Sequence, residues 1–337
     1  MDPVRRVVVI GYPAAELVDI ACVTSALVMA NWLHGSAVYD VTVATPGGRP
    51  IECGSGLTLQ AQATLERLNG PLDTVLVSGG IGHVDAAADH RLVAHVRRLA
   101  QESRRVASVC TGAGVLAAAG LLDGRRAATH WFQADDLAAT YPAVCFDSEP
   151  IYVRDGNVVT SAGVTSALDL TLAFIEEDVD ADLARGVARH MVTYLQRPGN
   201  QAQMSMFTSA PTASGDVVQR VVDKITADPG ADLTTASLAD EAGVSEHHLT
   251  RLFLHDVGVT PGRFVRRART ESAAHLLVTT GLTMDRIAGR CGFGSAESLR
   301  QAFVSRYGVS PSHFRRTQAM RPDGPSDVDA LAVEVTG

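Results

Sequence analysis

A chain of 337 residues is too long for one ordinary hydrophobic core, so its length predicts two folded units. With 46% hydrophobic and 20% charged residues, the composition excludes an intrinsically disordered chain. The net charge of −8 would argue against a nucleic-acid partner if it were evenly spread, but residues 245–318 hold 11 Arg and no Lys against 5 Asp and Glu.

The sequence indicates neither a membrane segment nor a covalent or metal framework. No run of about 20 apolar residues occurs, so we expect a cytoplasmic protein without a membrane partner. The five cysteines are odd in number, widely spaced and never form a Cys-x-x-Cys pair. We therefore predict no disulfide framework, no metal site and no cofactor.

The first half of the chain alternates short apolar runs with segments of helical spacing. The apolar runs predict buried strands over 7–10, 41–44, 74–77 and 106–109. Helical spacing is found over 15–33, 90–102, 165–175 and 181–195. This alternation predicts an α/β fold with a doubly wound, mainly parallel sheet and helices on both of its faces.

A composition change marks the boundary between the two predicted units. Periodicity disappears near residue 197, where polar and small residues take over, and helical spacing returns at about residue 215. We place the α/β unit at 1–196, a linker at 197–214 and an all-helical unit at 215–318. The remaining residues, 319–337, contain Pro, Asp and Gly and predict a disordered tail.

The all-helical unit contains an internal repeat. Residues match at an offset of 50, as in the pairs Leu249/Leu299, Phe253/Phe303, Gly258/Gly308, Val259/Val309, Pro261/Pro311 and Phe264/Phe314. In each copy a helix is broken at a glycine, Gly243 or Gly292, and a second helix follows a capping serine, Ser245 or Ser295. This order predicts two helix-turn-helix motifs in tandem.

The second helix of each motif has one apolar and one polar face. The first is predicted over 247–254 and the second over 296–305, with Leu249, Leu252 and Phe253 facing inward in the first. A long helix from Pro261 to about Thr279 would span roughly 27 Å between the motifs. That length suits two helices docked about 34 Å apart in successive major-groove segments of DNA.

Specific motifs support this interpretation. The segment 234–315 contains Ala-Gly-Val-Ser-x5-Arg-Leu-Phe, Gly-Val-Thr-Pro, Ile-Ala-x2-Cys-Gly-Phe and Phe-x3-Tyr-Gly-Val-Ser-Pro. It resembles the DNA-binding domain of AraC/XylS-family transcription regulators. The resemblance implies sequence-specific binding to double-stranded promoter DNA, with RNA polymerase as a further candidate partner. It places at the DNA the residues His247, Thr250, Arg251, Glu297, Ser298, Arg300 and Gln301, of which Arg251 and Arg300 are expected to contribute most.

In the α/β unit, Cys110 is the strongest candidate for a chemically reactive residue. It follows the strand 106–109 and precedes a helix that starts at small residues, an arrangement that turns a nucleophile out of the sheet edge. Amides of the helix start would lower the thiol pKa, and the turn 78–82 would add a second amide for an oxyanion. Asp19 and His130 are candidate partners at the same crevice.

A second resemblance rests on these residues. Val109-Cys110-Thr111-Gly112-Ala113, together with Tyr12-Pro13-x5-Asp19 and Thr129-His130-Trp131, resembles the ThiJ/PfpI branch of the class I glutamine amidotransferase-like superfamily. With the helix-turn-helix unit, the whole chain resembles AraC regulators of the GlxA type. That resemblance implies a dimer whose first domain senses a small-molecule effector, such as an amino acid or a quaternary amine. The expected effector-binding residues are Asp19, Gly80, Cys110, Thr111 and His130.

Three functions remain open at Cys110. The superfamily's hydrolases carry a catalytic histidine after the cysteine, where this chain has Thr111, so we expect a regulator without catalytic residues. Isonitrile hydratases of the superfamily share an Asp and a Cys-Thr pair, which makes a cysteine-dependent enzyme the alternative, with Cys110, Asp19, Thr111 and His130 as candidate residues. A redox sensor that oxidises Cys110 is the third hypothesis.

Overall fold

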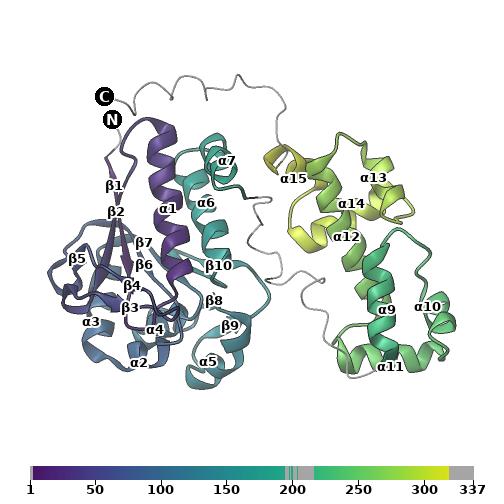
Figure 1. Cartoon of the computed structure of the whole chain (residues 1–337), viewed down its shortest axis with the longest axis horizontal. Coiled ribbons are helices and arrows are strands. Elements are labelled where there is room, and N and C mark those ends of the chain that lie inside the picture. Colours follow the sequence, from purple (N-terminus) through teal and green to yellow (C-terminus); the bar gives the residue numbers. More distant parts are fainter. Residues whose placement is uncertain (1–2, 194–196, 198, 200–202, 204–215, 319–337) are drawn as a thin grey trace. The chain divides into compact units, whose positions relative to one another are not determined.

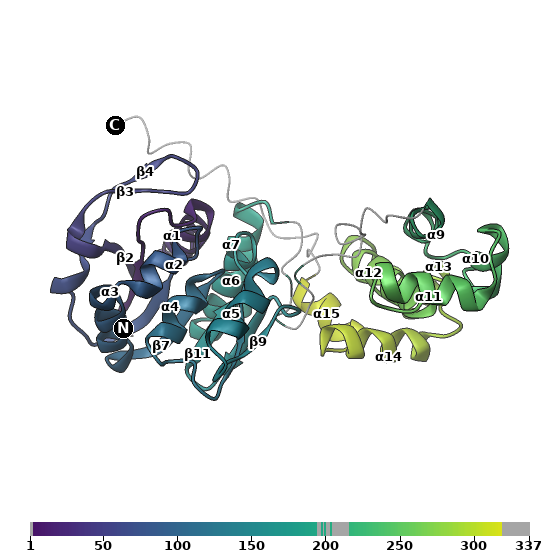
Figure 2. The same cartoon turned by 90° about the horizontal axis from the view of Figure 1, so that it is seen from below.

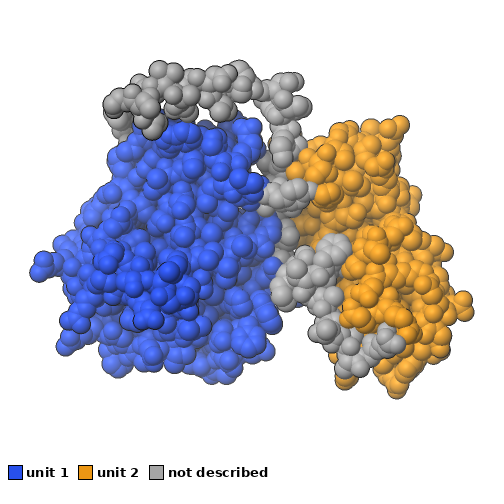
Figure 3. Space-filling model, in the orientation of Figure 1, with its two compact units in different colours: residues 1–208 blue, residues 209–337 orange. Residues whose placement is uncertain are grey.

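A computed structural model describes residues 3–193, 197, 199, 203 and 216–318 of the chain. The chain divides into two units, Met1–Thr208 and Ser209–Gly337 (Figure 3). The predicted tail and most of the predicted linker lie outside the described residues. The unit boundaries proposed from the sequence therefore stay a prediction.

The first unit is built on a seven-stranded sheet in the order β10-β11-β7-β6-β1-β2-β5. Every neighbouring pair is parallel except β10 and β11. The predicted doubly wound, mainly parallel sheet is thus confirmed. Its strands are β1 (Arg5–Ile10), β2 (Tyr39–Thr45), β5 (Ala63–Thr64), β6 (Leu72–Val77), β7 (Ser103–Val109), β10 (Tyr152–Asp155) and β11 (Val158–Ser161).

Helices cover both faces of this sheet (Figures 1 and 2). On one face α1 (Leu17–His34), α6 (Ser166–Asp178) and α7 (Ala181–His190) pack against one another. The other face holds α2 (His83–Ala88), α3 (His90–Gln101) and α4 (Gly112–Ala118). A helix was predicted over 181–195, and its predicted end was wrong. α7 stops at His190, and Val192 takes a left-handed backbone conformation with φ of 53°.

The first unit also contains short elements that were not predicted from the sequence. An antiparallel hairpin joins β3 (Ile51–Glu52) to β4 (Thr58–Leu59). A parallel pair joins β8 (Arg126–Ala128) to β9 (Cys145–Asp147), with α5 (Ala134–Thr140) between them in the chain. Single 3-10 turns lie at Pro46–Gly48, Leu65–Arg67 and Trp131–Gln133.

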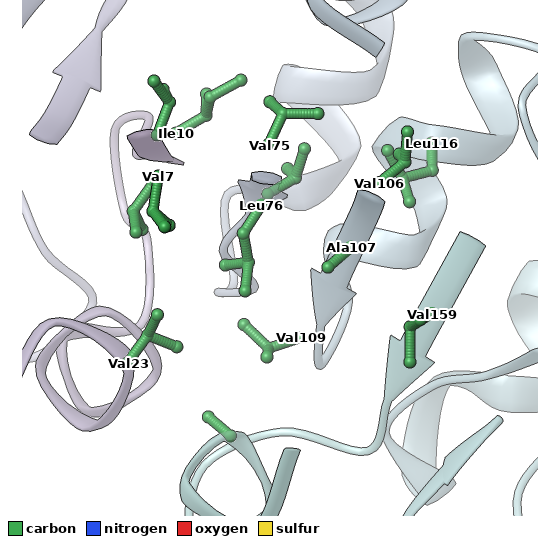
Figure 4. Close-up of a cluster of buried hydrophobic side chains, with 14 of the residues drawn as sticks. Val7, Ile10, Val23, Val75, Leu76, Val106, Ala107, Val109, Leu116 and Val159 are labelled. Carbon is green, nitrogen blue, oxygen red and sulfur yellow. The ribbon is translucent and has the colours of Figure 1, made fainter. Parts of the chain in front are cut away.

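The core explains why the central strands have near-continuous apolar runs. Side chains of β1, β6, β7 and β11 are buried from both sides, as Figure 4 shows for Val7, Leu76, Val106 and Val159. A parallel sheet covered by helices on both faces has no solvent side, so both sets of side chains must be apolar. The packed strands hold their carboxyl ends along one edge, where the candidate site lies.

The second unit is helical throughout its described residues, as predicted. Its helices are α9 (Asp216–Ala227), α10 (Thr235–Glu241), α11 (Glu246–Asp256), α12 (Pro261–Thr279), α13 (Met284–Arg290), α14 (Ala296–Tyr307) and α15 (Pro311–Gln318). α12 has the predicted bounds and connects the two helix-turn-helix motifs, α10–α11 and α13–α14. Compared with the predicted bounds, α11 is one residue longer at its start and two residues longer at its end, and α14 is two residues longer at its end.

The local features of the repeat are confirmed in both motifs. Gly243 and Gly292 take left-handed conformations with φ of 69° and 73°, which glycine adopts without strain. Ser245 Oγ accepts from the amide of His248 at 3.2 Å, and Ser295 Oγ accepts from that of Ser298 at 3.1 Å. The matched pairs Leu249/Leu299 and Phe253/Phe303 are buried, whereas Leu252 is only half-buried.

Candidate functional site

Cys110 lies at a strained elbow between β7 and α4. Its φ is 54°, a left-handed conformation that is uncommon for a side chain other than glycine. The Cys110 amide donates to the carbonyls of Ser161 at 3.0 Å and Ala162 at 3.1 Å, and the Thr129 hydroxyl donates to the Cys110 carbonyl at 3.0 Å. These bonds hold the elbow in the predicted strand–cysteine–helix geometry.

Two glycines enclose the cysteine. A Cβ atom at Gly163, where φ is +118°, would overlap the Cys110 side chain. A Cβ at Gly79 would overlap Cys110 as well and would lie 2.8 Å from Asp19 Oδ2. The close approach leaves Cys110 only 7% exposed. The sequence pointed to the turn with Gly79, but it gave no signal for Gly163, which precedes a predicted helix.

Asp19 braces the two turns that flank Cys110. Its Oδ2 accepts from the Gly79 amide at 3.0 Å and its Oδ1 from the Val164 amide at 2.6 Å. The carboxyl is fully buried, and this burial raises its pKa to about 7 against the opposing effect of the two amides. Asp19 therefore joins the turn after β6 to the loop after β11.

Thr111 closes the same turn from the other side. Its hydroxyl donates to the Gly80 carbonyl and accepts from the Gly80 amide, both at 2.9 Å. The turn 78–82 was expected to add a second amide for an oxyanion, and two of its amides are used within the chain, that of Gly79 by Asp19 and that of Gly80 by Thr111. Neither of these two amides is free to be that second donor.

The thiol of Cys110 is also less acidic than its place at a helix start suggests. Burial, and next the charge of Asp19, raise its pKa to about 12. Thr111, through its amide first and its side chain second, lowers the Cys110 pKa but does not outweigh burial. The expected lowering of the thiol pKa is corrected, and Cys110 is a neutral thiol at neutral pH.

His130 and Tyr12 are two further polar residues near Cys110. His130 is half-buried, its Nδ1 accepts from the Phe132 amide at 3.3 Å, and burial lowers its pKa. Its link to Cys110 runs through the preceding Thr129. Tyr12, which we did not select, is buried and donates to the Ser78 carbonyl at 2.9 Å. Burial, Cys110 and Asp19 raise the Tyr12 pKa.

The start of the predicted linker is bonded beside this centre. Arg197 Nη2 donates to Asp169 Oδ2 at 2.6 Å and to Thr165 Oγ1 at 3.1 Å. Gln203 Nε2 donates to the Thr129 carbonyl at 2.7 Å, and Gln203 Oε1 accepts from the Trp131 amide at 2.9 Å. The chain that leaves the first unit is thus attached to both loops that flank Cys110. This attachment could not be predicted from the sequence, because the segment is polar and has no periodicity.

In the second unit, the polar faces of α11 and α14 are open to solvent. Side chains at the predicted DNA positions are exposed, namely His247, Arg251, Glu297, Arg300 and Gln301, or half-exposed, namely Thr250 and Ser298. Arg300 makes two bonds to the Glu297 carboxylate at 2.7 and 2.6 Å, and Gln301 adds a third at 3.1 Å. The Arg300 hydrogen bond, followed by that of Gln301, lowers the Glu297 pKa to about 2.

The repeat also reveals two exposed apolar residues that we did not select. Leu254 in α11 and Val304 in α14 match at the 50-residue offset, and they are 51% and 37% exposed. Apolar side chains on a groove-facing helix contact thymine methyl groups. At the same offset Arg251 matches Gln301 and Thr250 matches Arg300, so the two helices present different polar groups.

Several arginines of this unit have structural roles. Arg269 donates to the carbonyls of Pro229 and Ala231, both at 2.9 Å. Arg315 donates to the carbonyl of Leu282 at 2.7 Å, and Arg306 forms an ion pair at 3.0 Å with the buried carboxylate of Glu271. The positive charge counted from the sequence therefore overstates the charge available to DNA.

Comparisons with known proteins agree with both halves of this description. The model of the DJ-1/PfpI family matches residues 5–177, which is more than half of the chain, and a helix-turn-helix domain model matches residues 238–317. The chain belongs to the DJ-1/PfpI family. Its helix-turn-helix part makes this DJ-1/PfpI protein a DNA-binding transcription regulator of the AraC type, as its relatives also indicate.

Two relatives and one solved structure show how similar this DJ-1/PfpI regulator is to known proteins. The HTH-type transcriptional regulator GlxA of Rhizobium meliloti is 31% identical over 89% of this chain and 92% of its own. An isonitrile hydratase of Pseudomonas putida is 39% identical, but over only 44% of this chain and 67% of its own. The crystal structure of a ThiJ/PfpI family protein from Pseudomonas syringae has a TM-score of 0.51 and 26% identity, covering 67% of this chain and 87% of that one.

Proposed function

We propose that the DJ-1/PfpI unit of this regulator senses a small metabolite at the Cys110 centre, and that the regulator works as a homodimer on promoter DNA. The observation that carries the proposal is the attachment of Gln203 beside Cys110. Gln203 lies on the chain that leads to the helix-turn-helix unit, and its side chain bonds to Thr129 and Trp131. A sensor needs such a connection between its ligand site and its output.

Two short paths link the centre to this outgoing segment. The Thr129 hydroxyl bonds to the Cys110 carbonyl, while the Thr129 carbonyl accepts from Gln203. On the other side, Asp19 holds the Val164 amide, and the next residue, Thr165, accepts from Arg197. A ligand that favours another position of either loop shifts the outgoing segment, and differential binding of this kind gives a typical coupling of about 1–3 kcal/mol.

In this proposal, α11 and α14 are the helices that contact the promoter DNA. We propose that Arg251 and Arg300 bind guanine or phosphate, and that His247, Thr250, Ser298 and Gln301 make the remaining polar contacts. Glu297 holds Arg300 by two hydrogen bonds, which fixes the direction of the guanidinium before DNA arrives. The carboxylate also repels phosphate, so this helix discriminates among sequences more than it adds affinity.

A thermal-shift screen tests the sensing function. The full chain is heated with a panel of amino acids and quaternary amines, and we expect one class to raise the midpoint of unfolding. Replacement of Cys110 by Ala should reduce that shift, because it alters the centre itself. Replacement of the exposed Cys145 by Ala serves as the control. Equal shifts in the Cys110 variant and the control would contradict a site at Cys110.

A cysteine-dependent enzyme is the second candidate, supported by the cluster of Asp19, Cys110 and Thr111 and by the isonitrile hydratase relative. The geometry favours it less. A nucleophile must be a thiolate, whereas burial raises the pKa of Cys110 to about 12, and the same fact weakens the redox-sensor hypothesis. Turnover of an isonitrile by the full chain, abolished by Cys110→Ser, would favour the enzyme over the sensor.

A further inference from the structure

One position in the second helix of each helix-turn-helix motif points directly away from the core of the second unit. The inward faces of α11 and α14 are formed by matched, fully buried residues, Leu249 with Leu299 and Phe253 with Phe303. Each residue turns a helix by about 100°, so the residue two places after the leucine lies about 180° from the middle of the inward face. This outermost position holds Arg251 in α11 and Gln301 in α14, both exposed.

The two helices present this position in the same setting. Each begins after a serine cap. Each also carries an exposed apolar residue three places after the outermost position, Leu254 in α11 and Val304 in α14. Because the caps, the buried residues and the apolar neighbours match, we expect both helices to enter the major groove in the same orientation. A difference at the outermost position is therefore a difference in the base that each helix contacts.

A side chain about one turn earlier holds each outermost residue. Arg251 Nη2 donates to His248 Nδ1 at 3.1 Å, and Gln301 Nε2 donates to Glu297 Oε1 at 3.1 Å. Each bond uses a single N–H, so the guanidinium keeps further donors, and the carboxamide keeps its oxygen and its other N–H. Both side chains are thus ordered before DNA arrives, which lowers the entropy cost of a contact made through two hydrogen bonds.

We propose that the two motifs read different bases at this matched position, guanine by Arg251 and adenine by Gln301. The proposal rests on the DNA contacts proposed above and names the base at each of the two half-sites, the stretches of DNA that one motif contacts. A guanidinium donates parallel hydrogen bonds to O6 and N7 of guanine. A carboxamide donates to N7 of adenine and accepts from its N6 amino group.

Arg300 is a poorer reader of the second half-site than Gln301. It lies only about 80° from the middle of the inward face, on the flank of α14. Its Nε and Nη2 atoms already donate to the Glu297 carboxylate at 2.7 and 2.6 Å. A side chain on the flank of a groove-facing helix meets the phosphates that border the groove. Arg300 therefore adds affinity, whereas Gln301 adds specificity.

The consequence is an operator with unequal half-sites. Leu254 and Val304 both suit a thymine methyl group, so the half-sites share a thymine and differ at the neighbouring guanine or adenine. α12 connects the motifs within a single chain, so the half-sites lie on the DNA in a fixed order, about one helical turn apart. A promoter with two identical half-sites would satisfy only one of the motifs.

Selection of DNA by the full chain from a library of randomised duplexes tests this assignment. The wild-type chain should enrich sites with guanine in one half-site and adenine at the matching place of the other. Arg251→Gln should change that guanine to adenine, and Gln301→Arg should change that adenine to guanine, because each variant carries the residue of the other motif. Arg263→Gln, at the exposed start of α12, removes the same charge as Arg251→Gln and should leave the selected bases unchanged.

Competition between duplexes that differ in this single base pair measures the exchange. The wild-type chain should prefer guanine in the first half-site by about ten- to a hundredfold, and Arg251→Gln should reverse that preference. Variants that bind more weakly but select the same bases overturn the base assignment and keep both residues at the DNA. Variants with unchanged affinity and unchanged bases also overturn the proposed placement of these residues. A wild-type chain that enriches no sequence overturns the base assignment and the proposed DNA contacts together.

Discussion

The Cys110 centre and the polar faces of α11 and α14, the two binding sites proposed here, differ in how their polar groups are used. At Cys110 the polar groups are buried and bonded to one another: Asp19 to two amides, and Thr111 to both polar groups of Gly80. On α11 and α14 the polar side chains stand in solvent. A ligand at the Cys110 centre would have to replace internal hydrogen bonds, whereas DNA would only have to approach the exposed side chains of α11 and α14.

This difference suits a sensor and an output. A centre whose bonds are all internal has a defined resting state, and a ligand that replaces some of those bonds changes the conformation by its differential affinity. An exposed, charged helix face binds through electrostatic attraction and depends on salt. If the buried centre is tightly constrained and the helix faces are accessible, substitutions at the centre should affect stability, whereas substitutions on the helix faces should affect DNA binding.

The largest effect is expected from Gly163→Ala. The new Cβ would overlap Cys110 at a φ of +118°, so we expect a loss of about 3 kcal/mol or more in the free energy of unfolding. Gly289→Ala is the control in the second unit, because Gly289 lies inside α13 with open space around it. That change should stabilise by about 0.5–1 kcal/mol. Equal effects in a urea titration would show that the centre is not tightly packed.

Next in size are the DNA contacts. Arg251→Ala or Arg300→Ala should weaken binding to the chain's own promoter by about ten- to a hundredfold at fixed salt, because each would remove one of the proposed contacts to a base or a phosphate. Fluorescence anisotropy with labelled promoter measures the loss. Arg98→Ala, on α3 of the first unit, removes the same charge outside the helix-turn-helix unit and should have no effect. Unchanged affinity in both helix variants would remove them from the interface.

The third effect in size is a dependence of the protein's stability on pH. Burial raises the Asp19 pKa to about 7, so the folded state holds this proton more tightly than the unfolded chain does. Its contribution to stability is therefore full below pH 4 and is lost as pH rises towards 7. The unfolding temperature of the wild-type chain relative to Asp19→Asn should fall by a few degrees between pH 5 and pH 8. A constant difference would mean that Asp19 titrates normally.

The smallest effect concerns Glu297. Without its carboxylate, Glu297→Gln no longer repels phosphate or fixes Arg300, so affinity for unrelated DNA should rise by about threefold while the preference for the promoter falls. Competition with unrelated DNA measures both quantities. Glu246→Gln, at the exposed start of α11, is a control for the charge alone. A loss of affinity for both DNAs would instead make Glu297 a direct base contact.

Much of this was predictable from the sequence. The central strands and both helix-turn-helix motifs were found because burial on both faces, or a fixed repeat, imposes a regular pattern. Cys110 and Asp19 were found from their places after strands. Gly163 and Gln203 were missed because their roles depend on contacts distant in the chain, the latter with Thr129, 74 residues away. The thiol pKa was misjudged because burial outweighs the helix amides.

The central claim is that the state of the Cys110 centre reaches the DNA through the segment that carries Gln203. It is tested by promoter affinity of the full chain, by fluorescence anisotropy, with and without the metabolite found in the thermal-shift panel. In the wild-type chain the metabolite should change the affinity by about fivefold or more. In Gln203→Ala it should still raise the unfolding temperature but leave the affinity unchanged. Equal responses of the two proteins would contradict the claim.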